Sequence, residues 1–193
     1  MNEKNTNPST SFISHLSELR SRLLRSSAFF FIAFVISYIF AENIYSYLVK
    51  PYSNAVIENE LNRRLIFTAL HEAFLTYLKV AFFTAVFITS PIFLTEIWKF
   101  VAPGLYKNEK KTLLPYLIAT PLLFFFGGIL VYYFIMPLAI KFFLSFETAA
   151  NPQMIAMQLE AKVNEYLSLV MRLIFAFGIS FQLPVVLSLL ARI

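Results

Sequence analysis

Long apolar runs alternate with polar segments along this chain of 193 residues. Four runs, at about 23–45, 73–98, 113–137 and 166–190, reach the roughly 20 residues that a helix needs to cross a bilayer. These runs must be helical, because lipid cannot satisfy the open edge of a sheet. The pattern predicts an all-α, polytopic membrane protein in which residues 1–193 form a single membrane domain with four transmembrane helices.

A shorter apolar stripe precedes the first run. Phe12, Leu16, Leu19 and Leu23 recur at the three- and four-residue spacings that place side chains on one face of a helix. His15, Glu18 and Arg22 lie elsewhere on the surface of this segment. The pattern predicts an amphipathic helix over 11–22 that lies in the membrane interface.

Several residues indicate bent and closely packed spans. Interior prolines remove a backbone hydrogen bond and kink a helix, so a scaffold of kinked helices is expected. Gly127 and Gly128 permit close helix contact in the third span, although ordinary packing explains the pair equally well. The prolines within or at the ends of the spans are Pro91, Pro115, Pro121, Pro137 and Pro184.

The composition supports the membrane class. Hydrophobic residues make up 59% of the chain and charged residues 14%, whereas a soluble domain has about 25% charged residues. There is no cysteine, which excludes disulfides and cysteine-ligated metals. The net charge is +5, but the basic residues lie beside apolar runs, so they indicate membrane topology rather than nucleic-acid binding.

The distribution of basic residues predicts the orientation, because lysine and arginine gather on the cytoplasmic side. Nine of them fall in the N-terminal segment, the loop around 99–111 and the C-terminus, against five in the loops on the other side. The second set of loops also holds most of the glutamates. We therefore expect a cytoplasmic N-terminus, with the loops near 46–72 and 138–165 facing outward.

Enzyme motifs are nearly absent. His71 and Glu72 begin like a zinc-binding HExxH helix, but Leu75 occupies the position of the second histidine. Ser180 is not followed by the glycine of a nucleophile elbow, and the chain has no P-loop. We expect no enzymatic activity, no metal site and no cofactor.

Two polar clusters lie on the predicted cytoplasmic side. The first runs from His15 to Leu23 (HLSELRSRL), and the second from Pro103 to Lys111 (PGLYKNEKK). By spacing alone, the first reads as an interfacial helix with a Glu18–Arg22 pair. The second reads as a Pro-Gly turn followed by a solvated helix start.

Taken together, these clusters resemble the TatC family. The first cluster resembles the opening motif of that family, and residues 90–109 (SPIFLTEIWKFVAPGLYKNE) resemble the end of its second span and its first cytoplasmic loop. Residues 166–184 (YLSLVMRLIFAFGISFQLP) resemble its fourth span. The residues that match the scaffold of the family are Pro51, Pro91, Pro103, Gly104 and Pro184.

The resemblance implies a receptor of the twin-arginine translocation system in the cytoplasmic (inner) membrane. Such a receptor binds the twin-arginine signal peptides of folded proteins, recruits small single-span TatA/TatB-type subunits, and supports export driven by the proton-motive force. It also implies a homo-oligomer within the receptor complex. Carried over to this chain, Glu18 and Glu109 would contact the arginine pair, Arg20 would order that site, and Gln182 would contact a partner helix.

Other interpretations of these residues remain open. Gln182 could instead bond to a backbone carbonyl freed by Pro184, and Glu96 could pair locally. Glu96 and His15 are secondary candidates for the signal-peptide site, and many relatives are expected to carry glutamine at the position of Glu96.

The alternative function is a small-molecule secondary transporter, although the chain shows no internal repeat. The family has six spans, so the end of the chain after the fourth predicts a C-terminal truncation. The cargo proteins and the size of the oligomer are not encoded in any motif.

Overall fold

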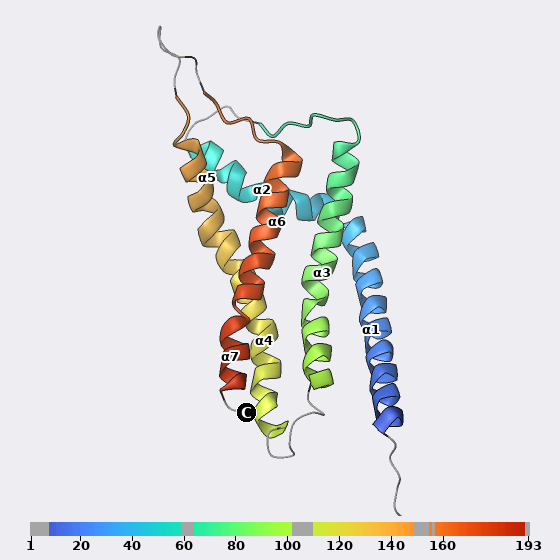
Figure 1. The fold of residues 1–193 in the computed structure, drawn as a ribbon. Coiled ribbons are helices and arrows are strands. Elements are labelled where there is room, and N and C mark those ends of the chain that lie inside the picture. The colour runs from blue at the N-terminus through green and yellow to red at the C-terminus, as the bar shows by residue number, and fades with distance from the viewer. Residues whose placement is uncertain (1–7, 59–63, 102–109, 149–154, 156, 192–193) are drawn as a thin grey trace, which may run out of the picture.

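The computed structural model describes residues 8–58, 64–101, 110–148, 155 and 157–191, and these form a helical bundle (Figure 1). No strand occurs within these ranges, where only two isolated bridges pair Ile66 with Lys162 and Thr148 with Met157. The helices are α1 (Pro8–Ile39), α2 (Ala41–Glu58), α3 (Glu72–Val101), α4 (Lys110–Leu130), a π-helical segment η2 (Val131–Ile135), α5 (Met136–Leu144), α6 (Val163–Ser180) and α7 (Leu183–Leu190). The predicted all-α class is confirmed.

Within the part of the chain that the structure describes, four helical stretches are long and apolar enough to cross a membrane: Leu19–Ile39, Glu72–Ile97, Pro115–Leu144 and Val163–Leu190. Only 11 to 39% of their most apolar windows is buried within the protein. Their remaining apolar surface therefore requires lipid as its solvent. The prediction of four membrane-spanning helices is confirmed.

The chain differs from the sequence prediction around the first span. Residues 11–22 do not form a separate helix but continue directly into the span, because α1 runs unbroken from Pro8 to Ile39. The predicted span 23–45 ends early, at Ile39, and much of the predicted loop 46–72 is helix α2. The first span ends at Ile39 because the chain turns at Phe40. After this turn, α2 runs in a different direction and lies across one end of the bundle (Figure 1). We call this the α2 end, and the opposite end, where α1 begins, the N-terminal end.

Helix α2 is held in place by an apolar face and by tyrosines. Leu48, Tyr52, Ala55 and Val56 are buried, at the spacings of one helical face, and they join a core formed with α3, η2, α5 and α6. Pro51, within α2, is buried as well. The Tyr166 hydroxyl donates to the carbonyl of Leu48 at 3.1 Å.

The π-helical segment brings two successive tyrosines to α2. The Tyr132 hydroxyl donates to the carbonyl of Tyr47 at 2.7 Å, and the hydroxyls of Tyr47 and Tyr133 lie 3.1 Å apart. The wider turn is closed by the Met136 N–H, which bonds to the Val131 carbonyl five residues back. The hydrogen bond to Tyr133, followed by burial, raises the pKa of Tyr47.

Proline affects the other spans in two ways. In α3, Pro91 lacks the N–H that would bond to the carbonyl of Phe87, and the Ser90 hydroxyl donates to that carbonyl at 2.7 Å instead. The helix therefore continues through Pro91. In the fourth span the helix breaks between α6 and α7, and Pro184 lies in the first turn of α7.

Candidate recognition site

The N-terminal end of the bundle brings together the segments that carry the predicted site. The first turns of α1, the end of α3 and the start of α4 lie at this end (Figure 1). Glu18 and His15 belong to α1, but their side chains lie outside the described part of the structure. Residues 102–109, with Pro103, Gly104 and Glu109, also lie outside it. The direct contact of Glu18 with Glu109 or with a ligand therefore stays a prediction.

An ion pair joins α1 to α3 near this end. Arg22 Nη1 lies 2.9 Å from Glu96 Oε2, and the two side chains are only 19% and 14% exposed. Glu96 thus pairs with a side chain of another helix, which the sequence did not indicate. Arg20, two residues earlier on α1, is exposed. The pair fixes the register of α1 on α3 next to the segment that carries Glu18 and Arg20.

We expect this pair to contribute measurably to the stability of the bundle. Arg22→Gln or Glu96→Gln removes an ion pair between two largely buried side chains, so each change should lower the free energy of unfolding by about 2 kcal/mol. The measurement is a double-mutant cycle of unfolding in mixed detergent. Arg25→Gln, at an exposed position of the same helix, is the matched control and should change it by less than about 0.5 kcal/mol. Additive losses in the double variant would show that the two side chains are not coupled.

Gln182 lies at the break between α6 and α7. Its Nε2 donates to the carbonyl of Thr120 on α4 at 3.0 Å and approaches the carbonyl of Gly178 at 3.5 Å. The Gly178 carbonyl is available because the Gln182 N–H bonds to Ile179 instead. Pro184 has no N–H, so the carbonyl that it frees is that of Ser180. The Gln182 side chain does not bond to that carbonyl but to those of Thr120 and Gly178. Its Oε1 is buried and has no hydrogen-bond partner among the described residues.

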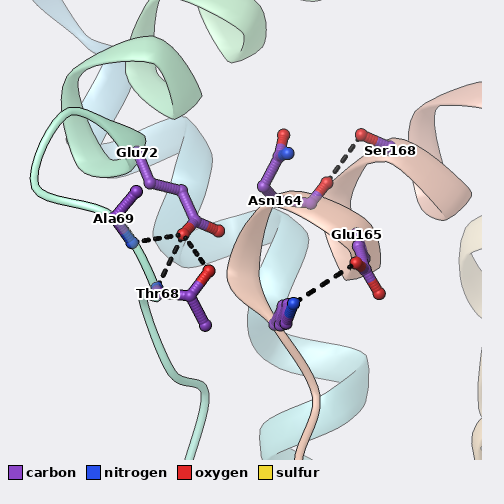
Figure 2. A network of polar contacts seen from close by, with 7 residues as sticks. Thr68, Ala69, Glu72, Asn164, Glu165 and Ser168 are labelled. Atoms are coloured by element: carbon purple, nitrogen blue, oxygen red, sulfur yellow. Dashed lines mark hydrogen bonds and ion pairs between the residues drawn. The ribbon is translucent and has the colours of Figure 1, made fainter.

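A second polar region lies at the α2 end and was not predicted as a site. Glu72, in the first turn of α3, is buried, and its Oε2 accepts hydrogen bonds from the Thr68 N–H at 2.7 Å, the Thr68 hydroxyl at 3.1 Å and the Ala69 N–H at 3.2 Å (Figure 2). These bonds close the turn that leads into α3. The Glu72 carboxylate is therefore stabilised by hydrogen-bond donors of the turn that directly precedes it.

The start of α6 faces this turn. Two backbone hydrogen bonds of 3.1 Å, from Ile66 to Ala161 and from Val163 to Ile66, hold the two segments together. Lys162 and Glu165 form an exposed ion pair of 3.9 Å, and the Ser168 hydroxyl donates to the Asn164 carbonyl at 2.6 Å (Figure 2). The sequence contained no signal for this region, because its partners are about 90 residues apart in the chain.

Lys79, in the third turn of α3, reaches this region. Its Nζ donates to Asn164 Oδ1 and, at 3.2 Å, to the Ser168 hydroxyl. The structure thus gives this lysine specific neutral partners on α6. Within the described ranges, no three His, Cys, Asp or Glu side chains gather closely enough to hold a metal ion.

These features define an all-helical, polytopic membrane protein whose N-terminal end is fixed by an ion pair and whose opposite end is covered by α2. Residues 14–193 match the family model described as Sec-independent protein translocase protein (TatC). The chain belongs to the TatC family.

Similar proteins support this assignment. The TatC of Magnetococcus marinus is 45% identical over 177 residues, which cover 92% of this chain and 62% of that protein. The TatC of Rickettsia prowazekii is 47% identical, over 93% of this chain and 70% of that protein. A crystal structure of the twin arginine translocase receptor TatC superposes with a TM-score of 0.76 at 34% identity, covering 91% of this chain and 74% of that one. The chain therefore spans less than two thirds of the length of the Magnetococcus relative.

Proposed function

We propose that this chain acts in a twin-arginine protein translocase as the receptor that binds the signal peptides of folded substrate proteins. The observation that carries the proposal is the match to the TatC family over residues 14–193, together with curated relatives named as Sec-independent translocase proteins. These relatives do not support the alternative of a small-molecule transporter. A translocase subunit also points away from enzymatic chemistry in this chain.

Glu18 and Glu109 are proposed to bind the two arginines of the signal peptide, with Arg20 ordering the site. Two adjacent guanidiniums need carboxylate partners, and arginine forms bidentate pairs with carboxylates that lysine cannot form. The placement of α1 and of the start of α4 at the same end of the bundle supports a shared site (Figure 1). His15 is a secondary candidate at this site. Glu96 is a positioning residue, because it holds Arg22.

The proposal is tested by capture on an immobilised twin-arginine peptide. The full-length protein in detergent should be retained by this peptide and not by a matched twin-lysine peptide. Lysine has the same charge as arginine but lacks the planar guanidinium that forms two parallel hydrogen bonds with a carboxylate. Equal retention on both peptides would show that the binding is only electrostatic and would contradict the assignment of a twin-arginine receptor.

We also propose that the N-terminus lies in the cytoplasm and the α2 end faces outward, in a cytoplasmic (inner) membrane. The support is the excess of basic residues in the segments of the N-terminal end. The chain has no cysteine, so single cysteines can be introduced at Ser17 and Asn54, which are both exposed. An impermeant thiol reagent added outside intact cells should label Asn54→Cys and not Ser17→Cys. The reverse pattern would invert the topology.

Gln182 is proposed to contact the helix of a small single-span TatA/TatB-type partner. The support is its place within a span, at the break between α6 and α7, where the side chain is half-buried and a polar group on a neighbouring helix can bond to it. Such partners, and a homo-oligomer of this chain, belong to the proposed receptor complex.

Replacing Gln182 by alanine should reduce crosslinking to a partner helix about threefold, since hydrogen bonds between helices in membranes are worth about 0.6 kcal/mol on average. Capture on the twin-arginine peptide should be unchanged, because the residue lies within a span. Leu183→Ala, at the next and exposed position, is the control. Loss of peptide capture with normal partner crosslinking would reverse the assignment.

A further inference from the structure

A pocket of about 680 Å³ lies at the α2 end, between α1, the start of α3 and the start of α6. Its polar lining comes from the turns at the starts of α3 and α6, which include Glu72 and Asn164. Its apolar lining, including Phe34, Leu78 and Phe82, lies further along the spanning helices α1 and α3. In a bilayer, the pocket is therefore polar near the membrane surface and apolar further inward. A lipid has the same order of groups along its length.

Lys79 supplies a positive charge in the wall of this pocket. It belongs to the second membrane-spanning stretch, and its Nζ donates only to neutral oxygens, those of Asn164 and Ser168. No carboxylate in the described part of the chain lies within ion-pair distance of it. A charged group in a membrane span is costly without a counter-ion, so it marks a site at which an anion is expected. An ammonium has three N–H donors, and two are in use, which leaves one for an oxygen of an anionic ligand.

The carboxylates in the pocket wall are already engaged. Glu72 accepts three hydrogen bonds from Thr68 and Ala69, in the turn before α3. Glu165 pairs with Lys162 and is 73% exposed at the rim. Among the described residues of the wall, Lys79 is thus the lysine without an ion pair, and a ligand with one negative charge would provide one.

We propose that this pocket binds a monoanionic phospholipid from the leaflet at the α2 end, with its phosphate diester on the Lys79 ammonium and one acyl chain along Phe34, Leu78 and Phe82. The phosphate group supplies the missing counter-ion, and the acyl chain covers the apolar wall. The proposal depends on the membrane-spanning fold and not on the proposed receptor function. A soluble phosphate would satisfy the charge and leave the apolar wall uncovered.

The test measures lipid retention by native mass spectrometry of the full-length protein, titrated with phosphatidylglycerol or phosphatidylcholine. Phosphatidylglycerol should bind more tightly, and Lys79→Gln should weaken its binding about tenfold, as expected for the loss of a hydrogen bond to a charged group. The matched control is Lys141→Gln, which removes an exposed lysine from α5 near the same end, outside the pocket lining. It should bind like the unchanged protein.

A second variant tests the proposal without removing the lysine. Asn164→Asp keeps the shape of the side chain and gives Lys79 an internal counter-ion, so it should also weaken phosphatidylglycerol binding, whereas Lys79→Arg should preserve it. Unchanged binding in both Lys79→Gln and Asn164→Asp, or an equal loss in Lys141→Gln, would overturn the proposal. Equal competition by soluble glycerol phosphate would assign the site to a free anion. Crosslinking of Lys79 to a single-span helix, with no retained lipid, would assign it to a protein partner.

Discussion

Glu18→Gln and Glu109→Gln should each weaken the binding of a twin-arginine peptide about fivefold, and the double variant should approach the affinity for a twin-lysine peptide. An ion pair near the membrane surface stays partly hydrated and contributes about 1 kcal/mol, which corresponds to that factor. Bidentate geometry would add to it. Because neither pair is strong alone, recognition should require both carboxylates, with further affinity from the apolar segment of the peptide along the spans.

The measurement is a double-mutant cycle in the full-length protein that pairs each glutamate with each arginine of the peptide. Glu42→Gln is the matched control, because Glu42 is exposed at the start of α2, at the other end of the bundle. Membrane insertion should be unchanged in all variants. If neither glutamate couples to either arginine, the site lies elsewhere, and the two clusters are an interfacial helix segment and a solvated loop.

Gly127→Ala should lower the free energy of unfolding by about 2 kcal/mol, even though alanine favours a helix over glycine by about 1 kcal/mol. A Cβ at Gly127 would lie 2.9 Å from the Phe177 carbonyl oxygen and 3.0 Å from the Gly178 Cα, both in the backbone of α6. A backbone cannot rotate away as a side chain can. The substitution must therefore push α4 away from α6, which opens the packed contact between them.

Gly128→Ala is the matched control for this prediction. Its Cβ would lie 2.9 Å from the tip of the Phe87 ring, a side chain that can shift, and 3.3 Å from a methyl group of Ile174. We expect a change of less than about 1 kcal/mol. Both variants are compared by thermal unfolding in detergent. A stable Gly127→Ala protein would show that α4 and α6 do not need this close approach.

Part of the candidate site could be predicted from the sequence. The motif around Glu18 and Arg20 predicts the segment, and α1 and α4 both begin at one end of the bundle (Figure 1). The contact of Arg22 with Glu96 could not be identified. Local spacing predicts a pair with Glu18, whose side chain lies outside the described part of the structure, and the structure shows an ion pair between Arg22 and Glu96, 74 residues away. Sequence spacing reports neighbours on one helix and contains no information about which helices lie side by side.

The sequence by itself determined the helical class and the four spanning stretches. In lipid, an apolar run of sufficient length has few alternatives to a helix that satisfies its own backbone. It also predicted kinks at the interior prolines, because proline has no N–H to donate, and the structure divides the fourth span just before Pro184. Tertiary structure alone decided that the predicted first span ends at Ile39 and that residues 41–58 form a helix across the bundle. That helix is held by distant partners such as Tyr132 and Tyr166, and the neutral partners of Lys79 likewise come from the start of α6. Such contacts join residues about 85 or more positions apart, so only the packed bundle brings them together.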